Sequence, residues 1–182
     1  MSVGDKGNGA AGGRPRFRSV LLICAANTAR SVMAEHLMRR ELARRGADSE
    51  VRVQSAGIAP YARDGALVSL DTRMALRDIG IDIGEEATST DLKRHPELLE
   101  AADVVIAMTE AQKRELSERF AVAPALEVHT LRGLAGESGD IADPFEQGHE
   151  AFSGCREEIT RLIPLVVERI LAEAEADQGA MR

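Results

Sequence analysis

The chain is poor in cysteine, aromatic residues and long apolar runs, and each shortage excludes a class of protein. Two cysteines among 182 residues cannot form a disulfide framework, and the four histidines lack ligand spacing, so we expect no metal and no other cofactor. No apolar run approaches the roughly 18 residues of a transmembrane helix, and the Gly-rich start lacks a secretory signal core. We therefore expect a cytoplasmic protein with no membrane partner.

Basic residues are also in the minority, at 23 against 30 acidic ones, which gives a formal net charge of −7. An acidic protein repels the nucleic-acid backbone, so we expect no nucleic-acid partner, and a basic loop in such a chain suits a small anionic group. The length and the hydrophobic content of 44% fit one globular domain. We expect a monomer or a weak dimer.

Short apolar runs alternate with segments of helical periodicity along the chain. The predicted strands are residues 19–23, 51–55, 104–108 and 126–131, and the predicted helices are 31–45, 67–79, 92–101, 110–120 and 150–176. This alternation is typical of an α/β fold with a parallel sheet. We place one domain at residues 17–176, between a disordered tail at 1–16 and a C-terminal tail at 177–182.

The segment C-A-A-N-T-A-R-S, residues 24–31, joins the first strand to a helix. A loop that enters a helix N-terminus gathers backbone N–H groups that bind anions, and its field favours the thiolate form of a cysteine. Arg30 offers a planar fork for two phosphate oxygens. The pattern predicts a phosphate-binding loop with Cys24 as the nucleophile. The alternative, an inert buried cysteine and an exposed arginine, stays open at this point.

Such a nucleophile needs an acid, because a leaving alkoxide, phenoxide or amine must be protonated as its bond breaks. Asp143, in the sequence D-P-F of the Gly-rich loop 133–148, is the candidate. An aspartate before proline is also a common turn residue, so local sequence leaves this second interpretation open.

Four segments resemble the low-molecular-weight protein tyrosine phosphatases in order and spacing: V-L-L-I-C-A-A-N-T-A-R-S-V-M-A-E, S-A-G (55–57), A-D-V-V-I-A-M (102–108) and D-P-F (143–145). The resemblance spans residues 18–172. It implies a single-domain, three-layer α/β/α fold with a four-stranded parallel sheet of order 2-1-3-4. It also implies that Cys24 forms a phosphocysteine, that Arg30 binds the phosphate oxygens, and that Asp143 protonates the leaving group.

Further site residues follow from the loop and from the resemblance. The phosphate-binding residues are then Ala25, Ala26, Asn27, Thr28, Ala29, Arg30 and Ser31. Asn27 suits a left-handed backbone, and Ser31 can bond the thiolate or cap the helix. Ser55 resembles the family serine that braces the loop asparagine. Tyr61 falls where the family places an aromatic wall, although a lone tyrosine can simply cover a surface.

Several positions depart from the family pattern. Ala29 stands where many members have a second cysteine, Val32 replaces a common proline, and Ala26 replaces a common glycine. Thr28 replaces a bulky aliphatic residue and resembles the bacterial protein-arginine phosphatases. Substrate-binding residues are therefore expected at Thr28, Tyr61 and Phe145, with Glu146 able to attract a guanidinium.

Three functions remain open on sequence alone. The first is a phosphatase that acts on phosphoarginine or phosphotyrosine in phosphorylated proteins. The second is an arsenate reductase on the same scaffold. Residues 109–120 lack the further cysteines that its thioredoxin-coupled form needs, but a glutathione-dependent form stays open. The third is an inactive module that binds phosphoproteins.

Overall fold

Four parallel strands form the centre of the molecule. They are β1 (Ser19–Cys24), β2 (Arg52–Gly57), β3 (Val104–Ala107) and β4 (Glu127–Thr130), in the computed structural model, which describes residues 14–173. The sheet order is β2-β1-β3-β4, as predicted. Cys24 at the end of β1 pairs with Gly57 at the end of β2, so the carboxyl ends of these two strands meet at one edge.

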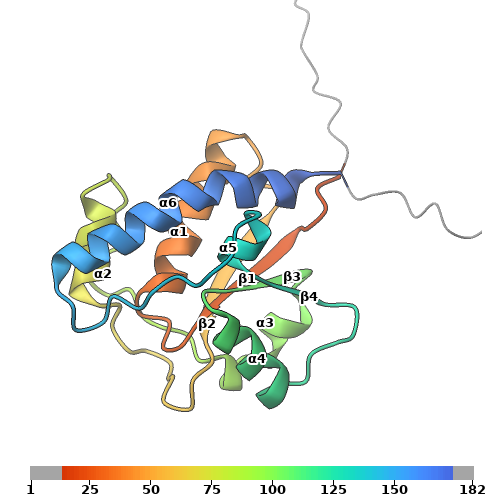
Figure 1. The fold of residues 1–182 in the computed structure, drawn as a ribbon, viewed down its shortest axis with the longest axis horizontal. Coiled ribbons are helices and arrows are strands. Elements are labelled where there is room, and N and C mark those ends of the chain that lie inside the picture. Colours follow the sequence, from red (N-terminus) through yellow and green to blue (C-terminus); the bar gives the residue numbers. More distant parts are fainter. Residues whose placement is uncertain (1–13, 174–182) are drawn as a thin grey trace, which may run out of the picture.

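Helices cover both faces of the sheet (Figure 1). Successive β1 side chains point to opposite faces. Val20 and Leu22 pack in one core with α1 (Arg30–Arg44), α2 (Leu70–Arg77) and α6 (His149–Leu171). Leu21 and Ile23 pack in the other with α3 (Pro96–Glu100) and α4 (Glu110–Arg119). This confirms the predicted three-layer α/β/α architecture.

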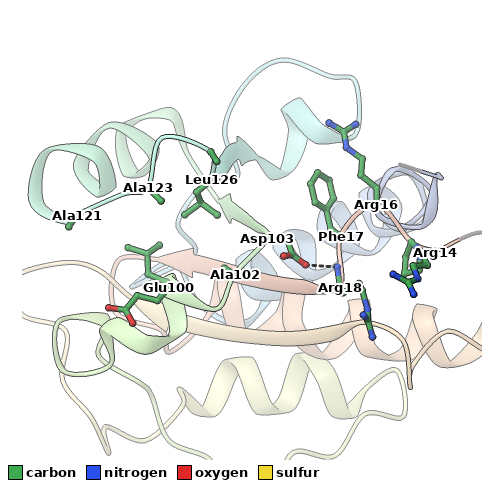
Figure 2. Close-up of a pocket in the computed structure, with 13 residues that line it drawn as sticks. Arg14, Arg16, Phe17, Arg18, Glu100, Ala102, Asp103, Ala121, Ala123 and Leu126 are labelled. Carbon is green, nitrogen blue, oxygen red and sulfur yellow. Dashed lines mark hydrogen bonds between the residues drawn. The ribbon is translucent and has the colours of Figure 1, made fainter. Parts of the chain in front are cut away.

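Asp103 ties the amino ends of β1 and β3 together. Its carboxylate accepts a hydrogen bond from the backbone N–H of Arg18 at 2.7 Å (Figure 2) and a second one from that of Ser19 at 2.9 Å. A cavity of about 620 Å³ opens beside it, with Phe17 and Leu126 in its wall. It lies at the amino ends of the strands, whereas ligands of parallel sheets bind at the carboxyl ends.

The predicted helix 92–101 was wrong as a single element, because it is interrupted at His95. The chain forms a short 3-10 turn, η1 (Leu92–Arg94), and then starts α3 at Pro96. The ring of a proline disfavours helical dihedrals in the residue before it, and His95 has φ −128° and ψ 58°. Pro96 then takes the first helical position, where its missing N–H is not needed.

Two other boundaries differ near helix caps. The predicted strand 126–131 ends at Thr130, whose Oγ1 accepts from the N–H of Gly133 at 3.0 Å and caps an unpredicted helix, α5 (Leu131–Leu134). Four residues are too few for a periodic pattern. Helix α2 starts only at Leu70, because Ser69 accepts from the N–H of Thr72 and caps it.

The last helix was predicted to reach residue 176 but ends at Leu171, since Ala172 has extended dihedrals. The backbone N–H of Arg16 donates to the Ala172 carbonyl at 2.9 Å, so the two ends of the described chain meet. Residues 1–13 and 174–182 of the predicted tails lie outside the described part. Within residues 14–173, no helix has both the length and the apolar character needed to cross a membrane.

Candidate active site

The phosphate-binding loop predicted from sequence connects the end of β1 to the start of α1. Strand β1 ends at Cys24 and α1 begins at Arg30, so residues 25–29 form the turn. Asn27 has φ 58°, which confirms the left-handed backbone expected of an asparagine there. The N–H groups of Ala26, Thr28 and Ala29 find no acceptor in the described part of the chain, which leaves them for an anion.

The Cys24 thiol is buried at the base of this loop. Its Sγ accepts from the backbone N–H of Asn27 at 3.3 Å and lies 3.0 Å from Ser31 Oγ. Helix α1 has Ala29 at its N-cap with no side-chain capping bond, so Ser31 contacts the thiol and does not cap the helix.

Gly57 explains why the S-A-G segment accompanies this loop. A Cβ atom at Gly57 would lie 2.8 Å from the carbonyl carbon of Ala26 and 2.9 Å from the carbonyl oxygen of Ala25, closer than real Cβ contacts. The next residue, Ile58, donates its N–H to the Cys24 carbonyl at 3.1 Å. A glycine is therefore needed for the backbone after β2 to support the loop from below.

The Asn27 side chain fixes the direction of a hydrogen-bond chain behind the nucleophile. Its Oδ1 accepts from the backbone N–H of Thr90 at 2.8 Å, which sets the orientation of the amide. Its Nδ2 then donates to Ser55 Oγ at 2.8 Å and to Ser31 Oγ at 2.9 Å. Because Ser31 Oγ accepts from Asn27, its own O–H is free to donate to the thiolate of Cys24.

Glu35 ends this chain, and sequence reasoning did not find it. Its carboxylate accepts from the Ser55 hydroxyl and is paired with Arg39 Nη2 at 2.6 Å. An ionised carboxylate can only accept, so Ser55 must donate to Glu35 and accept from Asn27. No local signal marks Glu35, because one acidic residue in a helix usually faces solvent.

Arg30 and Asp143, 113 residues apart in sequence, meet above the loop. Arg30 Nη2 donates to Asp143 Oδ2 at 2.8 Å, and Nη1 donates to the Ile141 carbonyl at 3.1 Å. Arg30 Nε is buried without a partner in residues 14–173. The Arg30 side chain is 6% exposed and that of Asp143 is 50% exposed. The guanidinium is therefore held in place, while the carboxyl group faces the open side of the site.

The backbone after Asp143 also fixes this carboxyl group. Asp143 Oδ1 accepts from the N–H of Phe145 at 3.2 Å, and its carbonyl accepts from Gln147 Nε2 at 2.7 Å. Glu146 has φ 60°, so a left-handed residue turns the chain back at this point. The segment 143–147 is therefore a turn, as the alternative interpretation of Asp143 predicted, and it also fixes the Asp143 carboxyl group.

Thr28 is held through its backbone by the start of α2. The Thr28 carbonyl accepts from the N–H of Ser69 at 3.2 Å and from Thr72 Oγ1 at 3.0 Å. Its side chain is left free to face the pocket.

A pocket of about 410 Å³ brings most of the predicted residues together. Its wall contains Cys24, Ala25, Ala26, Thr28, Ala29, Arg30, Tyr61, Asp143 and Phe145, together with the unpredicted Leu67, Ser69 and Phe152. The side chains of Asn27, Ser31 and Ser55 lie outside the pocket wall, behind the loop backbone, where they brace it. Phe152 was missed because its spacing in the last helix is that of a core residue.

Comparisons with known proteins agree with this fold. Residues 19–176 match the family model of the low molecular weight phosphotyrosine protein phosphatases. A protein-arginine-phosphatase from Geobacillus stearothermophilus is 32% identical over 154 residues, which cover 85% of this chain and 97% of the relative.

Solved structures of related enzymes share the fold. A low molecular weight protein tyrosine phosphatase from T. tengcongensis has a TM-score of 0.74 at 29% identity, covering 84% of this chain and 99% of that one. The arginine phosphatase YwlE, in a mutant with a phosphorylated active-site serine, also has a TM-score of 0.74, at 28% identity, covering 88% of this chain and 97% of that one.

Proposed function

Because the chain belongs to the low molecular weight phosphotyrosine protein phosphatase family, a family of cysteine-dependent hydrolases, we propose that it dephosphorylates protein side chains through a phosphocysteine and prefers phosphoarginine. The observation that carries the proposal is the buried Cys24 thiol beneath unpaired loop N–H groups, with Arg30 beside it. The relative with a phosphorylated active-site serine supports a covalent phosphoryl group in such a site.

In the first step, the thiolate of Cys24 attacks phosphorus and an S–P bond forms. The P–N or P–O bond to the substrate breaks, and Asp143 gives its proton to the leaving nitrogen or oxygen. The loop N–H groups and the Arg30 guanidinium hold the three equatorial oxygens, where negative charge is spread in the transition state.

In the second step, water attacks the phosphocysteine. Asp143, now a carboxylate, accepts a proton from that water, the S–P bond breaks, and inorganic phosphate and the Cys24 thiolate are released. This reaction requires a reduced thiol, which favours a cytoplasmic location.

The preference for phosphoarginine rests on position 28. The names of the relatives do not decide it, because they include arginine and tyrosine phosphatases of similar identity. A threonine in the pocket wall leaves room for a planar guanidinium, whereas a branched aliphatic side chain would press on a phenyl ring. The exposed Tyr61 face can hold a cationic guanidinium as well as a phenol, and Glu146 adds a negative charge nearby.

Two measurements test the proposal. The first is hydrolysis of a small aryl phosphate in the presence of a chelator by the wild type and by Cys24→Ser. We expect wild-type activity to persist, while the variant loses turnover and still binds phosphate. Turnover by Cys24→Ser, or wild-type activity restored only by a divalent ion, would exclude the mechanism.

The second measurement compares kcat/KM on phosphoarginine and phosphotyrosine peptides for the wild type and Thr28→Ile. We expect the wild type to prefer phosphoarginine and the variant to shift the ratio about 10- to 200-fold toward phosphotyrosine. If the wild type favours phosphotyrosine and Thr28→Ile leaves the ratio of the two kcat/KM values unchanged, the protein is a tyrosine phosphatase and position 28 does not select the substrate.

A further inference from the structure

Exposed apolar side chains are gathered near the mouth of the pocket. Within residues 14–173, the large hydrophobic side chains with high exposure are Tyr61, Leu67, Leu70, Met74, Phe145 and Leu165. Their exposed fractions run from 40% to 71%. All but Leu165 belong to the pocket wall or to the segment that follows it into α2.

The apolar surface continues in one direction from the pocket. Tyr61, Leu67 and Phe145 form the mouth itself. Leu70 opens α2, whose amino end is held against the phosphate-binding loop by the hydrogen bond from Ser69 to Thr28. Met74 lies one turn further on the same helix face. We call Leu70 and Met74 the α2 ridge.

The fold does not need the α2 ridge to be apolar. The opposite side of α2 supplies Thr72, Ala75 and Leu76 to the interior, where all three are buried. Single exposed apolar residues are common on protein surfaces, but a group of them beside a pocket marks an interaction site.

We propose that the α2 ridge binds an apolar side chain of the substrate protein, close in sequence to the phosphorylated residue. The inference rests on the proposed function, since it requires a phosphorylated protein side chain in the pocket. A pocket of about 410 Å³ takes that one side chain, and the substrate backbone must then cross the mouth formed by Tyr61 and Phe145. Substrate residues on the α2 side of the mouth reach Leu70 and Met74.

The occupant is therefore an extended segment with a leucine-like side chain at a position that flanks the phosphorylated residue. Continuity of the ridge with the pocket favours the substrate over an unrelated partner. A small phosphate ester fills the pocket without reaching the ridge. Comparing peptides with such an ester therefore separates the effect of the ridge on activity from that of the catalytic residues.

The test compares two phosphopeptides that differ only in having leucine or serine at the flanking positions, together with a small aryl phosphate. Both phosphoarginine and phosphotyrosine versions are used, so that the outcome does not depend on which one is preferred. We expect the wild type to favour the leucine peptide about tenfold in kcat/KM, as burial of one such side chain allows. Leu70→Ser/Met74→Ser should reduce this preference to about twofold and leave aryl phosphate hydrolysis unchanged.

Leu165→Ser is the matched control, because Leu165 is an exposed leucine near the end of α6. The start of α6, not its end, lies beside α2 (Figure 1). Leu165→Ser should keep the full preference. Single Leu70→Ser and Met74→Gln variants, checked by circular dichroism, replace the double variant if that one misfolds.

Three results would overturn the proposal. They are equal kcat/KM for both peptides in the wild type, an equal loss on peptides and aryl phosphate in the ridge variants, or a wild-type dimer that the ridge variants dissociate without changing peptide preference. Failure of the proposed function looks different, since the wild type would then hydrolyse none of the substrates.

Discussion

Asp143 and Arg30 share one short contact, 2.8 Å from Oδ2 to Nη2. In the mechanism proposed above, a phosphate group over Cys24 binds the same guanidinium, so substrate binding would compete with the Arg30–Asp143 pair. The carboxyl group has to leave Arg30 before it can protonate a leaving group. Substrate binding would therefore free the Asp143 carboxyl group, which must then take up a proton before it can act as the proposed acid.

Asp143→Asn should separate these two roles. We expect kcat to fall about 10²- to 10⁴-fold for substrates with poor leaving groups and less for p-nitrophenyl phosphate, because only the former need a proton. Inhibition by inorganic phosphate should be retained or tightened, since Arg30 loses its competing carboxylate. A plot of kcat against leaving-group basicity measures this. Glu150→Gln in α6 is the control, and an equal loss for every leaving group would contradict the assignment.

Glu35→Gln should weaken the hydrogen-bond chain behind Cys24. An amide in place of the carboxylate no longer obliges Ser55 to donate, so Ser31 is less firmly set to stabilise the thiolate. We expect kcat/KM to fall about tenfold at neutral pH and further at acidic pH. Arg39→Gln, which removes the other partner of Glu35, should change kcat/KM less than twofold. A lower melting temperature of Glu35→Gln, with an unchanged dependence of kcat/KM on pH, would show that Glu35 has only a structural role.

Gly57→Ala should displace the phosphate-binding loop. The added Cβ meets backbone atoms of Ala25 and Ala26, which cannot move as a side chain would. We expect a loss of about 1 to 3 kcal/mol in stability and a weaker affinity for vanadate. Gly154→Ala is the matched control, since its added Cβ meets nothing within 4 Å beyond the adjacent backbone of its own helix, and alanine favours a helix. Unchanged vanadate inhibition in Gly57→Ala would argue against this support.

Peroxide should oxidise Cys24 to sulfinic or sulfonic acid without forming a disulfide to Cys155. Burial raises the pKa of the Cys155 thiol to about 12, so at neutral pH it stays protonated and is a poor nucleophile toward a sulfenic acid. Ala29 supplies no thiol inside the loop. Mass spectrometry after mild oxidation gives the product. A Cys24–Cys155 disulfide as the main species, with full reactivation by a thiol reagent, would contradict this expectation.

Glu41→Gln should destabilise the protein only above mildly acidic pH. Hydrogen bonds from Arg44 and then Arg45 lower the pKa of Glu41 from 4.5 to about 2. Its stabilisation is therefore present above pH 4.5 and is lost as the pH falls toward 2. Solvent around the exposed Arg44 side chain screens its interaction with Glu41. We therefore expect Glu41→Gln to lower the free energy of unfolding by about 1 kcal/mol at pH 7 and to leave it unchanged at pH 2. Urea unfolding at both values, with Glu50→Gln as control, measures the difference.

The parts of the site that sequence predicts are those carried by contiguous chain. A strand, a loop and a helix place Cys24 and Arg30 together whatever the rest of the fold does, and the D-P-F segment identifies Asp143 by resemblance. Glu35 and Phe152 enter the site through tertiary packing, which local patterns do not encode. The break before Pro96 has a local cause in the proline itself, although residues 92–101 were predicted as one helix.

In the phosphate-binding loop, the backbone that faces the anion is held independently of the side chain at position 28. At position 28 the carbonyl is fixed by two hydrogen bonds from Ser69 and Thr72, neither of which depends on the side chain present there. In the proposed role of position 28, a mutation there changes the substrate while the anion-binding backbone keeps its shape. The proposed choice between phosphoarginine and phosphotyrosine would then depend on one side chain, without any change in the backbone that binds the phosphate.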